Sequence, residues 1–131
     1  MVVASGEGVP LGIHLDSAAP AEVKLIGQAL DNISVGDRTP IRLIADRGYD
    51  SDRFRSEMAE RGIEVIVPNR RGRRKTQDGR RLRRYRRRWI IERTMAWLGN
   101  FRRLIVRHEH HIDVYRGFFH LACLIITLNR L

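Results

Sequence analysis

The sequence IRLIADRGYDSDRFRSEMAERGIEVIV, residues 41–67, predicts a strand, a helix and a second strand. Ile41 to Ala45 and Ile63 to Val67 are short apolar runs with the length and composition of strands. The segment between them, Asp52 to Arg61, follows residues that cap helices and stops at Gly62, a residue typical of helix ends. A helix that connects two strands usually returns the second strand parallel to the first. This stretch therefore predicts an α/β fold with at least one parallel pair.

The residues before this stretch predict two more strands and another helix. Val2 to Ala4 and Leu11 to Leu15 are β-prone runs separated by glycines and a proline, which suits two strands joined by a turn. Ala21 to Ile33 carries apolar residues at helical spacing, and Pro20 suits the first turn of that helix.

The residues after it predict a helix that begins at about Arg80 and can break at Gly99-Asn100. On a helical wheel Glu92 lies roughly opposite the apolar stripe of this helix and on the same side as Tyr85 and Arg88. The stripe consists of Ile90, Trp97, Phe101 and Leu104.

Length and composition indicate one domain, residues 1–131, in a reducing cytoplasm. The chain has one cysteine and therefore no internal disulfide, and its first residues lack the pattern of a signal peptide. The longest nearly apolar run, Gly117 to Leu128, contains His120 and is shorter than the roughly 20 residues that cross a bilayer. We expect a buried helix there and no contact with a membrane.

One segment supplies the whole positive charge of the protein. Residues 70–88 hold 12 Lys or Arg and one acid, a net charge of +11, while the rest of the chain carries −1 of the total of +10. Such a segment favours an anionic partner, of which the phosphate backbone of DNA is the most abundant. The alternative is a solvated charged loop without a partner.

Several phrases of the sequence resemble one family. Tyr85-x2-Arg88-x3-Glu92 resembles the signature around the last acid of insertion-sequence DDE transposases. The chain is similar to their insertion-sequence-five group in GVPLG (8–12), HLDSAAPAEV (14–23), ADRGYDSD (45–52), GIEVIVPNRRGRRKTQDGRRLRRYRRRW (62–89), IERTMAWLGNFRRL (91–104) and FFHLACLIITL (118–128). The resemblance covers essentially the whole chain in order.

The resemblance implies an RNase H-like mixed sheet flanked by helices, with the first strand truncated at Met1 and residues 69–88 as a basic DNA-contacting insert. It implies metal-dependent cleavage and strand transfer of DNA in transposition, with Mg²⁺ or Mn²⁺ as the cofactor. The implied partners are the terminal repeats of the element, its target DNA and a second copy of the chain in a homodimer on DNA. The implied location is the cytoplasm, associated with the nucleoid.

The resemblance also assigns roles to residues. Asp46 takes the place of the second metal-binding acid and Glu92 that of the third. Arg88 would orient Glu92 or a phosphate, and Tyr85 would stack or hydrogen-bond near the DNA. Position 99, a lysine in the family, is Gly99 here. The residues expected to grip DNA are Arg70, Arg71, Arg73, Arg74, Lys75, Arg84, Arg86 and Arg87.

The first acid of the family falls on Ser5 in this chain. A hydroxyl brings no negative charge to a divalent ion, so we expect the chain to be catalytically impaired. The rival hypothesis is a non-catalytic basic remnant that occupies element ends on DNA. Without the resemblance, Asp46 would be interpreted as a strand-end or helix-capping acid, and Glu92 as a salt-bridge partner of Arg88.

Overall fold

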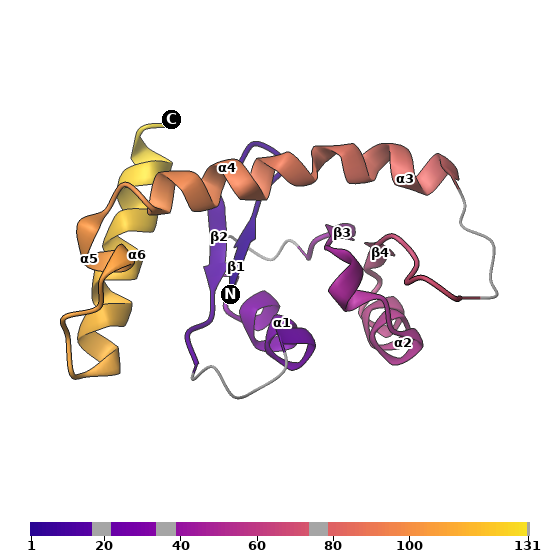
Figure 1. Ribbon diagram of the computed structural model, residues 1–131, viewed down its shortest axis with the longest axis horizontal. Helices are drawn as coiled ribbons and strands as arrows, with labels where there is room; N and C mark the ends of the chain where they lie inside the picture. The colour runs from indigo at the N-terminus through magenta and orange to yellow at the C-terminus, as the bar shows by residue number, and fades with distance from the viewer. Residues whose placement is uncertain (17–21, 34–38, 74–78, 131) are drawn as a thin grey trace. The chain divides into compact units, whose positions relative to one another are not determined.

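The computed structural model describes residues 1–16, 22–33, 39–73 and 79–130, which form short strands and helices (Figure 1). Chain contacts divide them into a terminal unit, Met1–Ser34 with Ile90–Leu131, and a central unit, Val35–Trp89. The elements are β1 (Val2–Ala4), β2 (Pro10–Ile13), α1 (Glu22–Asp31), β3 (Arg42–Ile44), the 3-10 helix η1 (Arg47–Tyr49), α2 (Asp52–Glu60), β4 (Glu64–Ile66), α3 (Gly79–Tyr85), the 3-10 helix η2 (Arg86–Arg88), α4 (Trp89–Leu98), α5 (Arg102–Ile105) and α6 (Ile112–Leu128).

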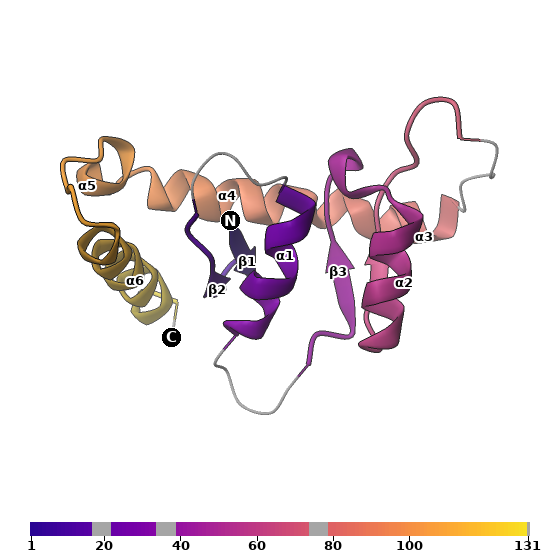
Figure 2. The same ribbon diagram turned by 90° about the horizontal axis from the view of Figure 1, so that it is seen from below.

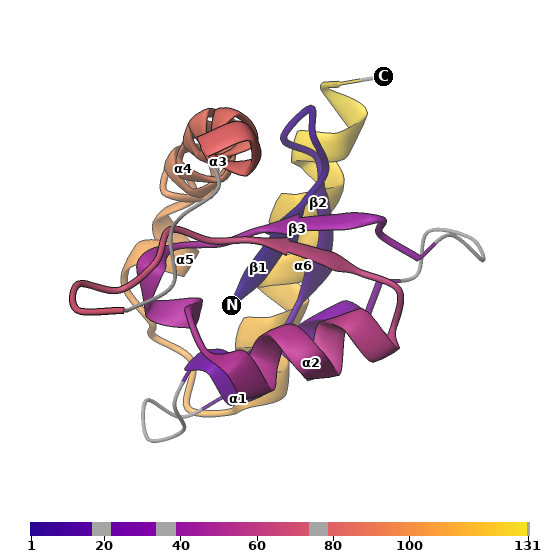
Figure 3. The same cartoon turned by 90° about the vertical axis from the view of Figure 1, so that its right-hand side faces the viewer.

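The central unit is built on β3 and β4, which pair in parallel with Leu43 opposite Val65. The predicted parallel pair is therefore confirmed. Helix α2 lies along one face of these strands (Figure 3) and buries Phe54 and Met58 there. Its first turn is fixed by Ser51, whose hydroxyl accepts the N–H of Phe54 at 3.3 Å.

The terminal unit is built on the antiparallel hairpin β1–β2, with α1 beside it (Figure 2). Gly12 of β2 permits this close approach, because a Cβ at that position would lie 2.5 Å from the carbonyl oxygen of Ala29 in α1. The core of the unit joins β2, α4 and α6, and its buried members are Ile13, Leu98, Phe119, Ala122 and Ile126.

The helical segment from Gly79 breaks where the sequence predicted, since α4 ends at Leu98. The predicted apolar stripe of this helix, Ile90, Trp97, Phe101 and Leu104, is only partly right. Helix α4 buries Ile90, Thr94 and Leu98, which follow one another at intervals of one helical turn. Because the helix has already ended, Phe101 and Leu104 reach the core from the following segment.

Helix α6 is longer than the predicted buried helix, and only one of its sides is buried. Phe119, Ala122 and Ile126 face the core, whereas the side chains of Leu121 and Leu128 are 51% and 58% exposed. Within the described residues, no helix has the length and apolar character needed to span a membrane. The chain is a mixed α/β protein, as the element order predicted.

Candidate active site

Asp46 lies between the end of β3 and the start of η1, which it caps. Its carboxylate therefore lies in a turn at the end of the strand. Its Oδ1 accepts the N–H of Gly48 at 2.7 Å, and its carbonyl oxygen accepts the N–H of Tyr49 at 3.1 Å. The side chain is half-buried. Asp46 is therefore a capping acid. A carboxylate has about four acceptor sites, so this cap leaves it able to bind a cation as well.

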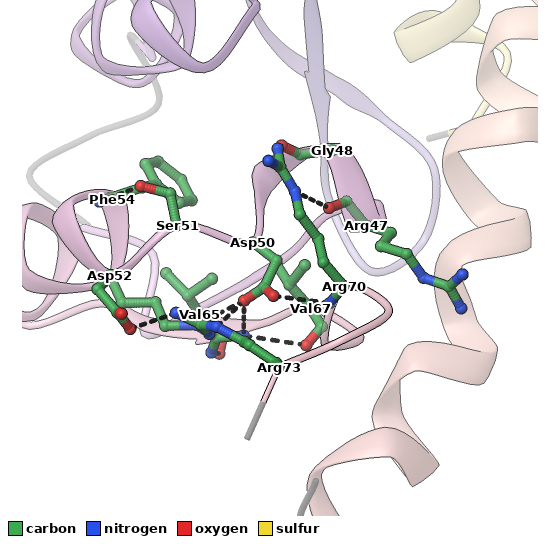
Figure 4. A network of polar contacts seen from close by, with 11 residues as sticks. Arg47, Gly48, Asp50, Ser51, Asp52, Phe54, Val65, Val67, Arg70 and Arg73 are labelled. Atoms are coloured by element: carbon green, nitrogen blue, oxygen red, sulfur yellow. Dashed lines mark hydrogen bonds and ion pairs between the residues drawn. The ribbon is translucent and has the colours of Figure 1, made fainter. Parts of the chain in front are cut away.

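Asp50, four residues further on, has a fully buried side chain. Its Oδ1 accepts Nη2 of Arg55 at 3.0 Å and Nη1 of Arg73 at 2.6 Å, and its Oδ2 accepts the backbone N–H of Arg70 at 2.8 Å (Figure 4). Burial by itself raises the pKa of this carboxyl. The Arg70 amide and the guanidinium groups of Arg55 and Arg73 outweigh that effect and hold the pKa below its ordinary value.

Two of the cations predicted to grip DNA are engaged inside the central unit. Arg70 donates from Nη2 to the carbonyl oxygen of Gly48 at 2.6 Å and from Nε to that of Arg47 at 3.4 Å. Arg73 joins Asp50 to Asp52. The DNA contacts of Arg70 and Arg73 stay a prediction, and both residues also have a structural role.

The remaining cations of the basic segment differ in their surroundings. Arg71, Arg86 and Arg87 are exposed, while Arg88 and Tyr85 are half-buried. Nη1 of Arg84 lies 3.6 Å from Oε2 of Glu64. Arg74 and Lys75 lie outside the described residues. Binding of DNA by this set is untested.

Glu92 is exposed in the first turn of α4, which follows η2 without a gap. Its neighbours Ile90 and Thr94 face the core, so the helix directs Glu92 away from it. The predicted polar face of the helix is therefore present at this residue.

The turn that contains Ser5 contacts the helix that carries Glu92, and both belong to the terminal unit. The Thr94 hydroxyl donates to the carbonyl oxygen of Gly8 at 2.8 Å, and Nη2 of Arg93 donates to that of Glu7 at 2.8 Å. Gly8 has a φ of +89°, and a Cβ there would lie 3.0 Å from Nη2 of Arg93. A larger residue at position 8 would therefore hold a strained backbone conformation and crowd the side chains of Arg93 and Thr94.

Ser5 itself stabilises this turn. Its Oγ accepts the N–H groups of Glu7 and Val9, each at 3.2 Å, and its backbone N–H donates to the carbonyl oxygen of Val9 at 2.8 Å. The hydroxyl thus occupies the place that an aspartate takes in an Asx turn, since both accept backbone N–H groups two residues on.

Thr94→Val tests the contact between this turn and α4. We expect the free energy of unfolding to fall by about 1–2 kcal/mol, because valine keeps the volume but leaves the buried Gly8 carbonyl without its donor. Thermal unfolding followed by circular dichroism measures the loss. The control is Thr127→Val, whose hydroxyl donates only within its own helix, to Cys123 at 2.8 Å; we expect a loss below about 0.5 kcal/mol. Equal losses of unfolding free energy in the two variants would show that the hydrogen bond from Thr94 to Gly8 does not stabilise the protein.

The acids are placed in two units, with Asp46 in the central one and Glu92 in the terminal one. Across residues 1–16, 22–33, 39–73 and 79–130, no three His, Cys, Asp or Glu side chains form a group that could hold a metal ion. A shared metal between Asp46 and Glu92 stays a prediction. The buried Asp50 was not foreseen as a site residue, because sequence spacing alone gives no signal for contacts 20 and 23 residues away.

Comparison with known proteins is consistent with the resemblance noted in the sequence. The family model described as transposase DDE domain matches residues 1–128. A protein of Burkholderia cepacia, named as a proposed transposase for insertion sequence element IS402, is 37% identical over 142 residues. That match covers 99% of this chain and 62% of the relative, so the chain spans less than two thirds of the relative's length. No solved structure gives a significant match. The chain belongs to the transposase DDE domain family.

Proposed function

We propose that the chain acts in DNA transposition as a DDE domain in which Asp46 and Glu92 bind a divalent metal ion, Mg²⁺ or Mn²⁺. The observation that supports this most directly is the docking of the Ser5 turn on α4 through Thr94 and Gly8. That contact joins the position of the family's first acid to the helix that carries its third. The fold we propose is RNase H-like, a mixed sheet flanked by helices.

The two acids suit such an ion. Mg²⁺ prefers carboxylate oxygens and is commonly held by only one or two carboxylates, together with water and substrate phosphates. Asp46 keeps acceptor sites beyond its bond to Gly48, and Glu92 is exposed. When bound, a pair of such ions activates the attacking oxygen and stabilises the leaving oxygen of a phosphodiester. Arg88 and Tyr85, in the segment before Glu92, would orient the phosphate or the adjacent DNA.

Ser5 weakens this site. It brings no charge to a metal ion, and its Oγ already accepts two N–H groups of its own turn. Two carboxylates leave half of the charge of a pair of divalent ions uncompensated. We therefore propose that cleavage by this chain is slow, and that it binds DNA ends and target DNA, as a homodimer in the cytoplasm near the nucleoid, more readily than it cuts them.

The second candidate function is DNA binding without catalysis, and the serine at position 5 favours it. A protein of this kind would occupy element ends through its exposed cations, such as Arg71, Arg86 and Arg87. Its affinity for DNA would fall with salt, because each phosphate contact releases counterions, but would not depend on a metal.

Asp46→Asn and Glu92→Gln separate the two functions. We expect each substitution to weaken Mn²⁺ binding at least about tenfold. Loss of a residue that only hydrogen-bonds to a metal ligand typically lowers metal affinity about 10–100-fold, and loss of a ligand itself should lower it at least as much. Electron paramagnetic resonance of Mn²⁺ measures this binding in the whole chain, and fluorescence anisotropy measures DNA binding without metal, which should not change. The control is Asp113→Asn, an exposed acid of α6. Mn²⁺ binding that is unaffected by both substitutions would leave only the DNA-binding function.

A further inference from the structure

We propose that Asp50 is a positioning residue for Asp46, acting through Arg70 and the η1 turn. This inference rests on the proposed role of Asp46 as a metal ligand. It assigns Arg70 to the support of that acid, although its place in the basic segment suggests a contact with DNA.

In the first step, Asp50 accepts hydrogen bonds from the start of the basic segment. Oδ2 accepts the Arg70 N–H at 2.8 Å, and Oδ1 accepts Nη1 of Arg73 at 2.6 Å. Between these residues the chain turns back, with the N–H of Arg73 bonded to the carbonyl oxygen of Arg70 at 3.3 Å and with Gly72 at a φ of +87°. Both ends of this turn are therefore fixed to one buried carboxylate.

The second step leads from Arg70 to η1. With its backbone fixed by Asp50, Arg70 extends its guanidinium to the carbonyl oxygens of Gly48, at 2.6 Å, and Arg47, at 3.4 Å (Figure 4). The contact to Gly48 is a charge-assisted hydrogen bond, which is stronger than a neutral one. Arg70 thus stabilises the conformation of the turn that follows Asp46.

The third step leads from η1 to Asp46. Arg70 bonds to the carbonyl oxygen of Gly48, and the N–H of the same Gly48 binds Oδ1 of Asp46 at 2.7 Å. Gly48 fits closely here, because a Cβ would lie 2.9 Å from the same Oδ1. A shift of the turn would therefore move the donor that orients the carboxylate.

The burial of Asp50 makes each of its partners important to this support. A buried carboxylate is stable only when its charge is matched, and here Arg55 and Arg73 match it while the Arg70 amide fills its other oxygen. Removal of any partner would leave a charge that is poorly compensated. We therefore expect this arrangement to fix the second acid before any ligand binds.

The test compares Arg70→Ala with Arg71→Ala. Both residues are exposed, and each substitution removes one positive charge from adjacent positions, but Arg70 is the one of the two that bonds to η1. We expect Arg70→Ala to speed hydrogen exchange of the Gly48 and Tyr49 amides about tenfold, and to weaken Mn²⁺ binding about threefold or more. Exchange in α2 and β4 should not change. Arg71→Ala should change neither quantity, and Arg70→Lys, which keeps the positive charge and a donor group at one position, should restore part of both.

The outcomes distinguish this inference from the proposed function. If Asp46→Asn weakens Mn²⁺ binding but Arg70→Ala alters neither exchange nor binding, the positioning role is refuted and the metal role stands. If Arg70→Ala speeds exchange but Asp46→Asn leaves Mn²⁺ binding intact, the metal role fails and the positioning role falls with it. Faster exchange throughout α2 and β4 would also refute the inference, because it would mean that Arg70 serves only general stability.

Discussion

Asp50→Asn is expected to lower the free energy of unfolding of the central unit by about 3 kcal/mol, the typical loss when one partner is removed from a buried ion pair. The Asp50 side chain is fully buried, whereas those of Arg55 and Arg73 are 25% and 21% exposed. Asparagine keeps the shape but not the charge, so two guanidinium groups would face a neutral amide. Urea unfolding followed by circular dichroism and by amide signals of β3 and β4 measures the loss.

Asp52→Asn is the matched control, because Asp52 also pairs with Arg73 but is 71% exposed. Exposed pairs contribute about 0.2–1 kcal/mol, so we expect a loss in that range. The pH dependence provides a second check. The pKa of Asp50 is lowered in the folded state, so its contribution is complete above the pKa it has when unfolded and is lost as the pH falls through the folded pKa. The wild-type protein should lose this stability below about pH 4, and Asp50→Asn should not. Equal losses for the two Asn variants, or the same acid profile in Asp50→Asn, would contradict the account.

Ser5→Asp is expected to raise Mg²⁺-dependent nicking of DNA on the order of 100-fold, because a third carboxylate would bring a further negative charge to the metal site. The turn can accept this change. One carboxylate oxygen can take over the N–H groups of Glu7 and Val9 that Oγ now accepts at 3.2 Å, which leaves the other oxygen available to a cation. DNA that carries the ends of the element is the substrate, and the rate of appearance of nicked product is the measurement. Mn²⁺ affinity should rise in parallel.

Ser5→Asn is the control for this gain. Asparagine also accepts the two N–H groups of the turn, since it favours the same local hydrogen bonds, but it is neutral. Nicking and Mn²⁺ affinity should stay at the wild-type level. A gain of similar size in Ser5→Asn would show that the turn, and not the charge, limits the reaction. A wild-type chain that already nicks as fast as Ser5→Asp would show that the serine does not impair catalysis.

Local patterns in the sequence predicted most of the elements. The segment around Ser51 and Gly62 specified both ends of α2 because capping is a local interaction. The helix–strand order then predicted the parallel pairing of β3 with β4. The apolar stripe was less accurate, because the helical wheel was drawn past Leu98 whereas helix α4 ends there. The buried positions of α4 include Thr94, which is polar and is buried because it bonds to a distant turn.

The number of charges alone could not show which cations of the basic segment have a structural role. Counting predicts that Arg70, Arg71 and Arg73 are equivalent, but Arg70 and Arg73 bond to residues of η1 and α2 and to Asp50. The sequence indicated Asp46 through its place at a strand end and through resemblance. It gave no indication of Asp50, because the burial of one acid among several depends on how a later segment folds back upon it.

The hydrogen bond from Thr94 to Gly8 spans 86 residues of sequence, and it closes a unit whose other elements come from both ends of the chain. The central unit, in contrast, is continuous. During synthesis, the central unit can therefore fold soon after it leaves the ribosome, while the hairpin β1–β2 has only α1 beside it and waits for α4 and α6. Closing so long a loop is slow compared with forming local contacts. We expect the early strands to be the part of the nascent chain that most needs protection by chaperones.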